Sequence, residues 1–235
     1  YQDNYNDNIK YDFQINEISL DNFVDTYRLG HTPIIIRSNS LVNQDEFIKS
    51  IEDSKHAHIQ LLESKKHKGF SDTPSIKSSL DSHISSFKSD FNSHQYFSVI
   101  RDYSSITNKN IWKDHLFFDD FWIDEGETWI FINSKGLQVP LHNDSVNNLH
   151  CVITGSKTFY LSPPSEAFIL STSISDYNSG FSDYNPFLNK NKSIQYGQFI
   201  RLYEGDMLYL PNGWWHSIYY DEDTMAASAF DEFVI

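Results

Sequence analysis

The chain has a single cysteine among its 235 residues. One cysteine excludes an intrachain disulfide framework and any zinc site built from several cysteines. Cys151 lies in the apolar run Leu-His-Cys-Val-Ile, which is typical of a small buried core residue. We therefore expect a reducing, cytoplasmic location, or a nuclear one in a eukaryote. Whether a leader was removed before Tyr1 stays an open question.

Basic residues are also few. The chain has 18 Lys and Arg against 32 Asp and Glu, for a formal net charge of −14, and its longest basic cluster is Lys65-Lys66-His67-Lys68. Nucleic-acid binding depends on Lys and Arg that neutralise phosphates, so a nucleic-acid partner is disfavoured. An acidic surface would instead attract a basic protein or peptide. A role of the charge in solubility alone is the open alternative.

Long apolar runs are missing as well. No run approaches the roughly 18 residues of a membrane-spanning helix, so no membrane partner is expected. Hydrophobic residues nevertheless make up 39% of the chain and aromatic residues 16%, which excludes a disordered protein. The length fits one domain over residues 1–235 with a substantial core.

The first 127 residues have mixed patterns. Segments 33–37, 56–61 and 95–100 have the composition or alternation of strands, whereas residues 19–28 and a segment beginning at Asn43 have helical spacing. Apolar residues recur every three or four positions within residues 72–94, which predicts an amphipathic helix, and the aromatic stretch 112–122 predicts another short helix. We expect a mixed α/β part here.

From residue 128 the pattern changes to short apolar runs separated by turn residues. Eight strands are predicted, at residues 129–133, 138–142, 149–154, 158–162, 199–203, 207–210, 215–220 and 225–230. Closely spaced strands without long helices indicate a mainly β jelly-roll core over residues 128–235. The long segment 165–198 is rich in aromatic residues and is expected to form an ordered cover over the barrel mouth.

One motif on these strands carries ligands for a metal. In Val139-Pro-Leu-His-Asn-Asp144, His142 and Asp144 are two residues apart and so share one face of a strand. His216 follows at the start of another predicted strand. Two imidazoles and one carboxylate suit non-haem Fe(II) and O₂ chemistry. A chance His-x-Asp is the simpler alternative, and His56 with His58 is a rival pair that lacks a matching carboxylate.

Lys157 opens the predicted strand after the turn Thr154-Gly155-Ser156. A lysine among inward-facing apolar residues is costly to bury unless an anion pairs with it, and a dicarboxylate cosubstrate would be such an anion. A turn lysine in water is the alternative.

Three stretches together resemble the Jumonji-C (JmjC, cupin-like) 2-oxoglutarate oxygenases. They are the Val-Pro-Leu-His-Asn-Asp motif, the run from Asn147 to Pro164, and Gly-Asp-Met-Leu-Tyr-Leu-Pro-Asn-Gly-Trp-Trp-His. Within the family they are most similar to protein hydroxylases of the JmjC-domain-containing protein 7 type. The resemblance implies a double-stranded β-helix core and dependence on Fe(II), 2-oxoglutarate and O₂, with ascorbate as a supporting reductant.

The resemblance also implies roles for individual residues. His142, Asp144 and His216 match the iron ligands, and Lys157 matches the lysine that binds the distal carboxylate of 2-oxoglutarate. Tyr96, Asn148 and Ser228 fall at further cosubstrate-binding positions, although Ser228 stands where relatives have asparagine. Val139 replaces a threonine, and His150 replaces a tyrosine. The sequence ends soon after the last predicted strand, so a monomer or weak dimer is expected.

The function implied is hydroxylation of a protein or peptide side chain, and the acidic composition favours Lys or Arg as the target. Two alternatives stay open. One is a hydroxylase of a small metabolite or free peptide. The other is a non-catalytic metal-binding cupin module.

Overall fold

The structure is a computed structural model. It describes residues 16–18, 31–37, 58–63, 75–79, 96–100, 128–170, 180, 182, 184–188 and 196–231. In this part of the chain no helix has the length and apolarity that crossing a bilayer requires.

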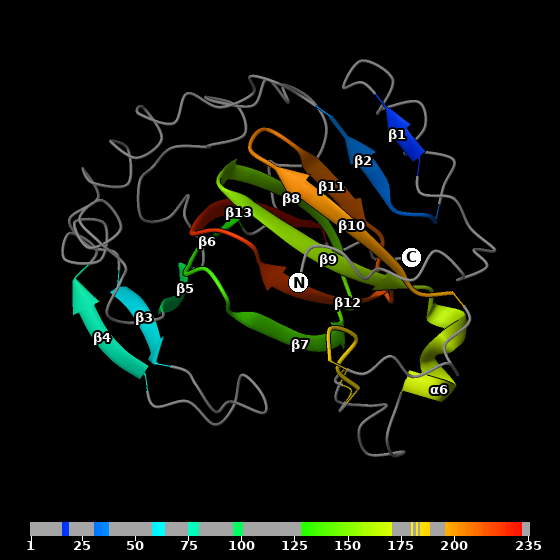
Figure 1. The fold of residues 1–235 in the computed structure, drawn as a ribbon, viewed down its shortest axis with the longest axis horizontal. Helices are drawn as coiled ribbons and strands as arrows, with labels where there is room; N and C mark the ends of the chain where they lie inside the picture. The colour runs from blue at the N-terminus through cyan, green and yellow to red at the C-terminus, as the bar shows by residue number, and fades with distance from the viewer. Residues whose placement is uncertain are drawn as a thin grey trace.

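The described strands form two sheets that face each other (Figure 1). The larger sheet has the order β1-β2-β11-β8-β13-β6-β5-β3-β4, and the smaller sheet has the order β10-β9-β12-β7. The larger sheet contains β1 (Asn16–Ile18), β2 (Ile34–Ile36), β3 (His58–Glu63), β4 (Ser75–Ser79), β5 (Tyr96–Ile100), β6 (Thr128–Asn133), β8 (Asn147–Thr154), β11 (Met207–Leu210) and β13 (Thr224–Asp231). The smaller sheet contains β7 (Gln138–Asn143), β9 (Ser156–Ser162), β10 (Gln198–Tyr203) and β12 (Trp215–Tyr220).

The eight strands predicted after residue 128 are confirmed as β6 to β13, and the fold is the mainly β jelly roll that was expected. Strands far apart in the sequence lie side by side: β8 pairs with β11 on one edge and with β13 on the other, both antiparallel. This pairing carries residues near 150, 210 and 228 into one sheet.

The main core lies between the two sheets, where apolar residues of both inner faces meet. It contains Ile35, Val152, Phe159, Leu161, Ile200, Leu202, Leu208, Leu210 and Trp214, all at most 8% exposed. Phe159 and Leu161 alternate along β9, and Leu208 and Leu210 alternate along β11, so each strand turns one face inward as its side-chain period requires. The same alternation determines which polar residues enter the interior.

In the N-terminal half, the buried strand expected at residues 33–37 is confirmed as β2. The strands expected at residues 56–61 and 95–100 are confirmed as β3 and β5. The helix expected within residues 72–94 is wrong for residues 75–79, which form β4 and pair antiparallel with β3. The hydrogen-bonding edge of β3 offers those residues a ladder, and tertiary pairing of this kind overrides a helical pattern. The other helices expected before residue 128 lie outside the described residues.

The segment 165–198 begins with a 3₁₀ turn, η2 (Pro164–Glu166), and the short helix α6 (Ala167–Leu170). Its described residues then run along the edge strand β7. The backbone N–H of Asn143 donates to the carbonyl of Gly180 (2.8 Å), and that of Ser182 donates to Leu141 (2.9 Å). Tyr184 and Phe187 pack on the outward-facing cluster around Tyr160. The expected position over the barrel mouth stays a prediction.

Candidate metal centre

His142 and His216 lie opposite each other on the adjacent strands β7 and β12. Two residues further along β12, Ile218 lies opposite Val139, three residues from His142. The strand β7 therefore contains one extra residue, a β-bulge, at Pro140–Leu141. Because of the bulge, Val139 and His142 share the inward face despite their odd spacing.

Asp144 follows directly after β7 and completes a cluster of three possible metal ligands. One ligand atom from each of His142, Asp144 and His216 lies within 4.8 Å of the others. Asp144 Oδ1 is 4.0 Å from His142 Nε2, and its Oδ2 is 3.7 Å from His216 Nε2. No other such group occurs among the residues whose side chains are described. Bonds of about 2.1 Å from a metal to each atom would need only small side-chain movements.

Backbone carbonyls orient both imidazole rings. Nδ1 of His142 lies 2.8 Å from the carbonyl oxygen of Pro140, and Nδ1 of His216 lies 3.1 Å from that of Trp214. A proton on each Nδ1 leaves the Nε2 lone pair facing Asp144, as a metal-binding histidine requires. Burial, and next the charge of His216, lower the pKa of His142 to about 4, so its ring is neutral at neutral pH.

Lys157 lies on β9 and is fully buried, which rules out the alternative of a turn lysine in water. Its Nζ has no hydrogen-bond partner in the described part of the chain. It lies 5.3 Å from the ring centroid of Tyr220 and 5.9 Å from that of Phe159. Phe159 belongs to the inner core, so Lys157, two residues before it on the strand, also faces the interior.

The surroundings of Lys157 fit an anionic ligand. Burial lowers the pKa of the ammonium group to about 7, against an ordinary value of 10.5. The two aromatic faces offset only part of the lost hydration, because cation–π contacts contribute less than an ion pair. A carboxylate placed at Nζ would restore the charge and the hydrogen bond.

The other predicted cosubstrate residues are placed as follows. Asn148 is buried on β8, and its Oδ1 has no hydrogen-bond partner among the described residues. Tyr96 opens β5, and its side chain is not described. Val139 is 4% exposed and offers only methyl groups to the interior.

Ser228 is in hydrogen-bond contact with His150. Its hydroxyl lies 2.7 Å from Nδ1 of His150, and the two residues are direct partners between β13 and β8. The sequence marked His150 only as a departure from the family pattern and not as a site residue. His150 is two residues from both Asn148 and Val152, so the three side chains share one face of β8. This spacing is the signal that could have placed His150 in the interior.

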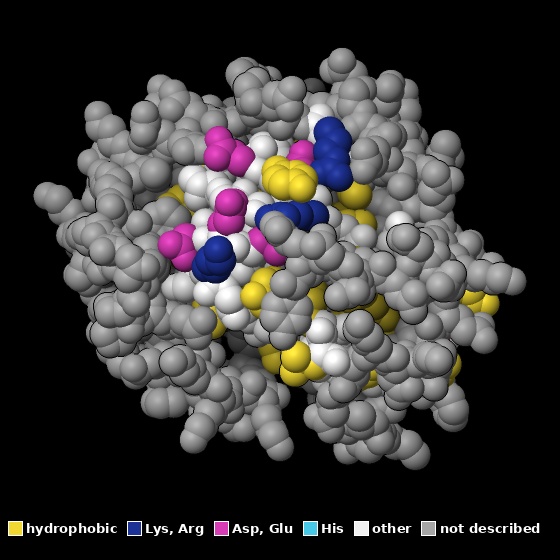
Figure 2. Space-filling view, in the orientation of Figure 1, with side chains coloured by type: hydrophobic (Ala, Val, Ile, Leu, Met, Phe, Trp, Pro, Cys, Tyr) yellow, Lys and Arg dark blue, Asp and Glu magenta, His cyan; other side chains and the backbone are white. Residues whose placement is uncertain are grey.

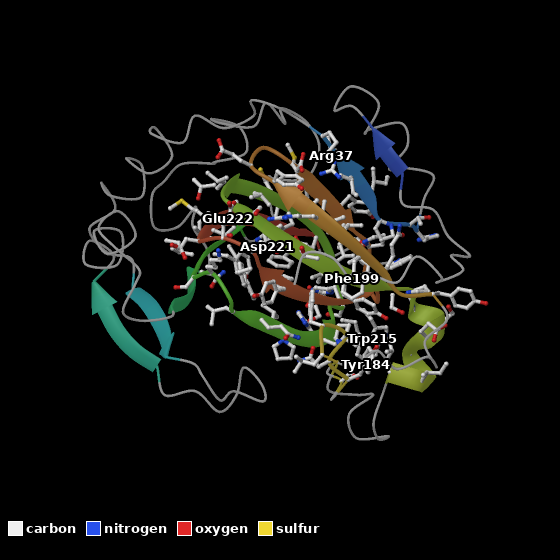
Figure 3. All side chains as sticks on the ribbon, viewed as in Figure 1. Arg37, Tyr184, Phe199, Trp215, Asp221 and Glu222 are labelled. Carbon is white, nitrogen blue, oxygen red and sulfur yellow. The ribbon has the colours of Figure 1, made fainter. Side chains whose placement is uncertain are left out.

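The aromatic residue directly before His216 packs away from the centre. Trp215 precedes His216 and so faces outward, where it joins Leu141, Tyr160 and Leu170. Figure 3 shows Trp215 and Phe199 on the α6 side of the sheet, with Tyr184 close by, while Asp221 and Glu222 lie at the opposite end. Trp215 therefore stabilises the strand that carries His216.

Charged groups share the described part of the face over β9 and β10 (Figure 2). Arg201 Nε lies 3.5 Å from Asp221 Oδ2, and Arg37 pairs with Asp206. Glu204 and Glu222 are exposed. The acidic excess is thus partly compensated here by arginines.

Comparison with known proteins agrees with this architecture. A family model described as "Cupin-like domain" matches residues 6–230, nearly the whole chain. The chain is also similar to a protein of Arabidopsis thaliana named lysine-specific demethylase JMJ31, with 31% identity over 109 residues. That similarity covers 42% of this chain and 19% of the plant protein. It supports membership of the JmjC group, whereas the JmjC-domain-containing protein 7 type stays a prediction.

Proposed function

The chain belongs to the cupin-like (JmjC) domain family, and on that premise we propose that it is an Fe(II)- and 2-oxoglutarate-dependent oxygenase. The observation that carries the proposal is the convergence of His142, Asp144 and His216 at one end of the barrel interior. Two imidazoles and one carboxylate on one side of a metal leave other positions open for ligands.

The residues present fit both cofactors. His142, Asp144 and His216 would hold Fe(II), and Lys157 would bind the distal carboxylate of 2-oxoglutarate. When bound, the metal and cosubstrate supply O₂-dependent oxidation of a C–H bond, coupled to decarboxylation of 2-oxoglutarate to succinate and CO₂. The protein's own part is to orient these groups, and its apolar core, with Phe159 and Leu161 on β9, excludes water.

We propose a side chain of a protein or peptide as the substrate, with Lys or Arg favoured. The net charge of −14 supports this choice, because an acidic protein concentrates basic segments near its surface.

Removal of a methyl group from lysine is a second candidate reaction. It is favoured by the similarity to the plant protein named as a lysine-specific demethylase. The same site chemistry serves both reactions, since oxidation of an N-methyl C–H bond gives an unstable product that releases formaldehyde.

Turnover and product mass separate these reactions. Purified protein with Fe(II), 2-oxoglutarate, ascorbate and basic peptides is expected to release succinate and to add one oxygen to the peptide. Formaldehyde from a methylated peptide would instead identify the demethylase, and products from metabolites alone would identify the small-molecule enzyme.

The matched variants are Asp144→Ala, which should abolish succinate release, and Glu222→Ala, which should not. Glu222 is an exposed acid at the far end of the sheet (Figure 3). Metal binding without turnover on any substrate would favour the binding module.

A further inference from the structure

His150 is a buried histidine with one satisfied and one unsatisfied ring nitrogen. The side chain is 4% exposed, and Nδ1 lies 2.7 Å from the Ser228 hydroxyl. Nε2 has no hydrogen-bond partner in the described part of the chain. An unpaired buried polar atom costs free energy, so a native structure normally supplies a partner for it.

The position of His150 indicates which group could pair with its Nε2. Its ring and that of Phe159 form a T-shaped pair with a centroid separation of 5.4 Å, and Lys157 Nζ lies 5.9 Å from the centroid of the same Phe159 ring. Burial, and next the charges of Lys157 and His216, lower the pKa of the His150 ring, which is therefore neutral. His150 thus lies in the interior within electrostatic reach of both the buried ammonium group and the metal centre.

We propose that His150 donates a hydrogen bond from Nε2–H to the carboxylate bound by Lys157, and that Ser228 is a positioning residue that fixes this tautomer. The inference rests on the proposed binding of 2-oxoglutarate. It assigns His150 a role in cosubstrate affinity, and it assigns Ser228 a role through His150 rather than by direct contact.

The tautomer follows from the hydrogen-bond inventory. A neutral imidazole has one donor and one acceptor nitrogen, and a hydroxyl can pair with either. When the Ser228 hydroxyl donates to Nδ1, the proton resides on Nε2. An anion at Lys157 selects this arrangement, since a carboxylate accepts hydrogen bonds and repels a lone pair.

The pair also explains how a carboxylate is held beside Val139, whose side chain has no hydroxyl. Val139 contributes only methyl groups to the inner face. A lysine alone acts as a point charge, whereas a second fixed donor sets the direction of the carboxylate. A histidine with a purely structural role in the core is the competing interpretation.

Calorimetric titration of 2-oxoglutarate into Mn(II)-loaded protein tests the proposal without turnover. The double variant His150→Phe/Ser228→Ala keeps a ring against Phe159 and leaves no unpaired hydroxyl. It should bind Mn(II) as the wild type does and bind 2-oxoglutarate at least about tenfold more weakly. His150→Gln, which keeps an N–H near the position of Nε2, should recover most of the affinity.

The outcomes are distinct. If the wild type does not bind 2-oxoglutarate, the proposed function fails. If the wild type binds it and the double variant binds within twofold, the role of His150 is wrong. Loss of binding in His150→Gln together with weaker Mn(II) binding would show a structural role and also contradict the proposal.

A second measurement does not depend on any variant. In ¹⁵N-histidine NMR spectra of the Zn(II)-loaded protein, adding 2-oxoglutarate should give His150 the Nε2–H tautomer. A proton found on Nδ1 in the complex would overturn the inference.

Discussion

Buried polar side chains, rather than exposed ones, define the candidate site at the scale of single residues. Lys157 Nζ, His150 Nε2 and Asn148 Oδ1 are buried without a hydrogen-bond partner among the described residues. All three belong to β8 or β9, whose inner faces meet in the core. Each unsatisfied group lowers stability, and each would gain from a ligand with complementary groups.

Lys157 gives the ligand-free protein a characteristic pH dependence. Its pKa is about 7 in the folded state and 10.5 ordinarily, so between these values the unfolded chain binds a proton that the folded chain does not. Stability from this group is present above the unfolded pKa and is lost as the pH falls towards 7. The free energy of unfolding should therefore rise with pH between about 7 and 9, by up to about 1.4 kcal/mol per unit. Above pH 9 the buried Cys151 thiol, whose pKa is raised from 9.0 to about 12, acts in the opposite direction.

Urea denaturation at several pH values measures this rise. Lys157→Met, which keeps an unbranched side chain without the charge, should remove most of the slope. Equal slopes in the variant and the wild type would show that Lys157 is not the group responsible.

Binding of 2-oxoglutarate should carry a proton with it. Above pH 7 the unliganded Lys157 is mostly neutral, and a bound carboxylate favours the ammonium form. At a pH of about 8, calorimetry in buffers of different ionisation enthalpy should show uptake of close to one proton. Lys157→Met should bind the cosubstrate far more weakly, and wild-type binding without proton uptake would contradict this.

At the scale of elements, the bulge in β7 determines which residues line the centre. Ser217, opposite the bulge on β12, donates a hydrogen bond of 2.6 Å to the carbonyl of Val139. This bond satisfies a buried acceptor where the regular ladder is interrupted.

Ser217→Ala should therefore destabilise the protein by about 1–2 kcal/mol and weaken Mn(II) binding, because His142 is positioned by the bulged strand. Chemical denaturation and metal titration measure the two effects. Ser145→Ala, at an exposed position near the centre, is the control and should change stability little. Unchanged metal affinity in Ser217→Ala would show that the bulge does not position His142.

The elements also show what sequence can and cannot predict. Short apolar runs predicted β6 to β13 because burial between two sheets requires them. The bulge was not predicted, since it follows from pairing between β7 and β12 rather than from either strand alone. The strand β4 was mistaken for helix for the same reason, as its partner β3 determines its structure.

In the candidate site, too, some residues were predicted from the sequence and others were not. Spacing and the family resemblance predicted His142, Asp144 and His216, and the structure brings these three together. The burial of Lys157 was left undecided by sequence, because a lysine after a turn is usually in water and only an anionic partner favours its burial. The contact of Ser228 with His150 depends on the register of β13 against β8, which no local pattern encodes.

At the scale of the whole molecule, charge governs the approach of a substrate. The net charge of −14 gives a long-range attraction for basic peptides. The described face over β9 and β10 offsets some acids with Arg37 and Arg201, but the excess remains over the full chain.

The rate of succinate release should therefore rise more with Lys- or Arg-rich peptides than with acidic peptides of equal length. Raising the ionic strength should increase the apparent KM for basic peptides, because salt screens this attraction. Steady-state kinetics at low and high salt measure both effects. Equal stimulation by acidic peptides would remove the argument for a basic substrate.

The proposed function requires that His142, Asp144 and His216 hold one metal ion. Anomalous X-ray diffraction from crystals grown with Mn(II) tests it most directly. We expect a single strong peak bounded by Nε2 of His142, Nε2 of His216 and a carboxylate oxygen of Asp144, and its loss in Asp144→Ala. A peak elsewhere, for example at His56 and His58, or no peak between the three residues, would contradict the claim.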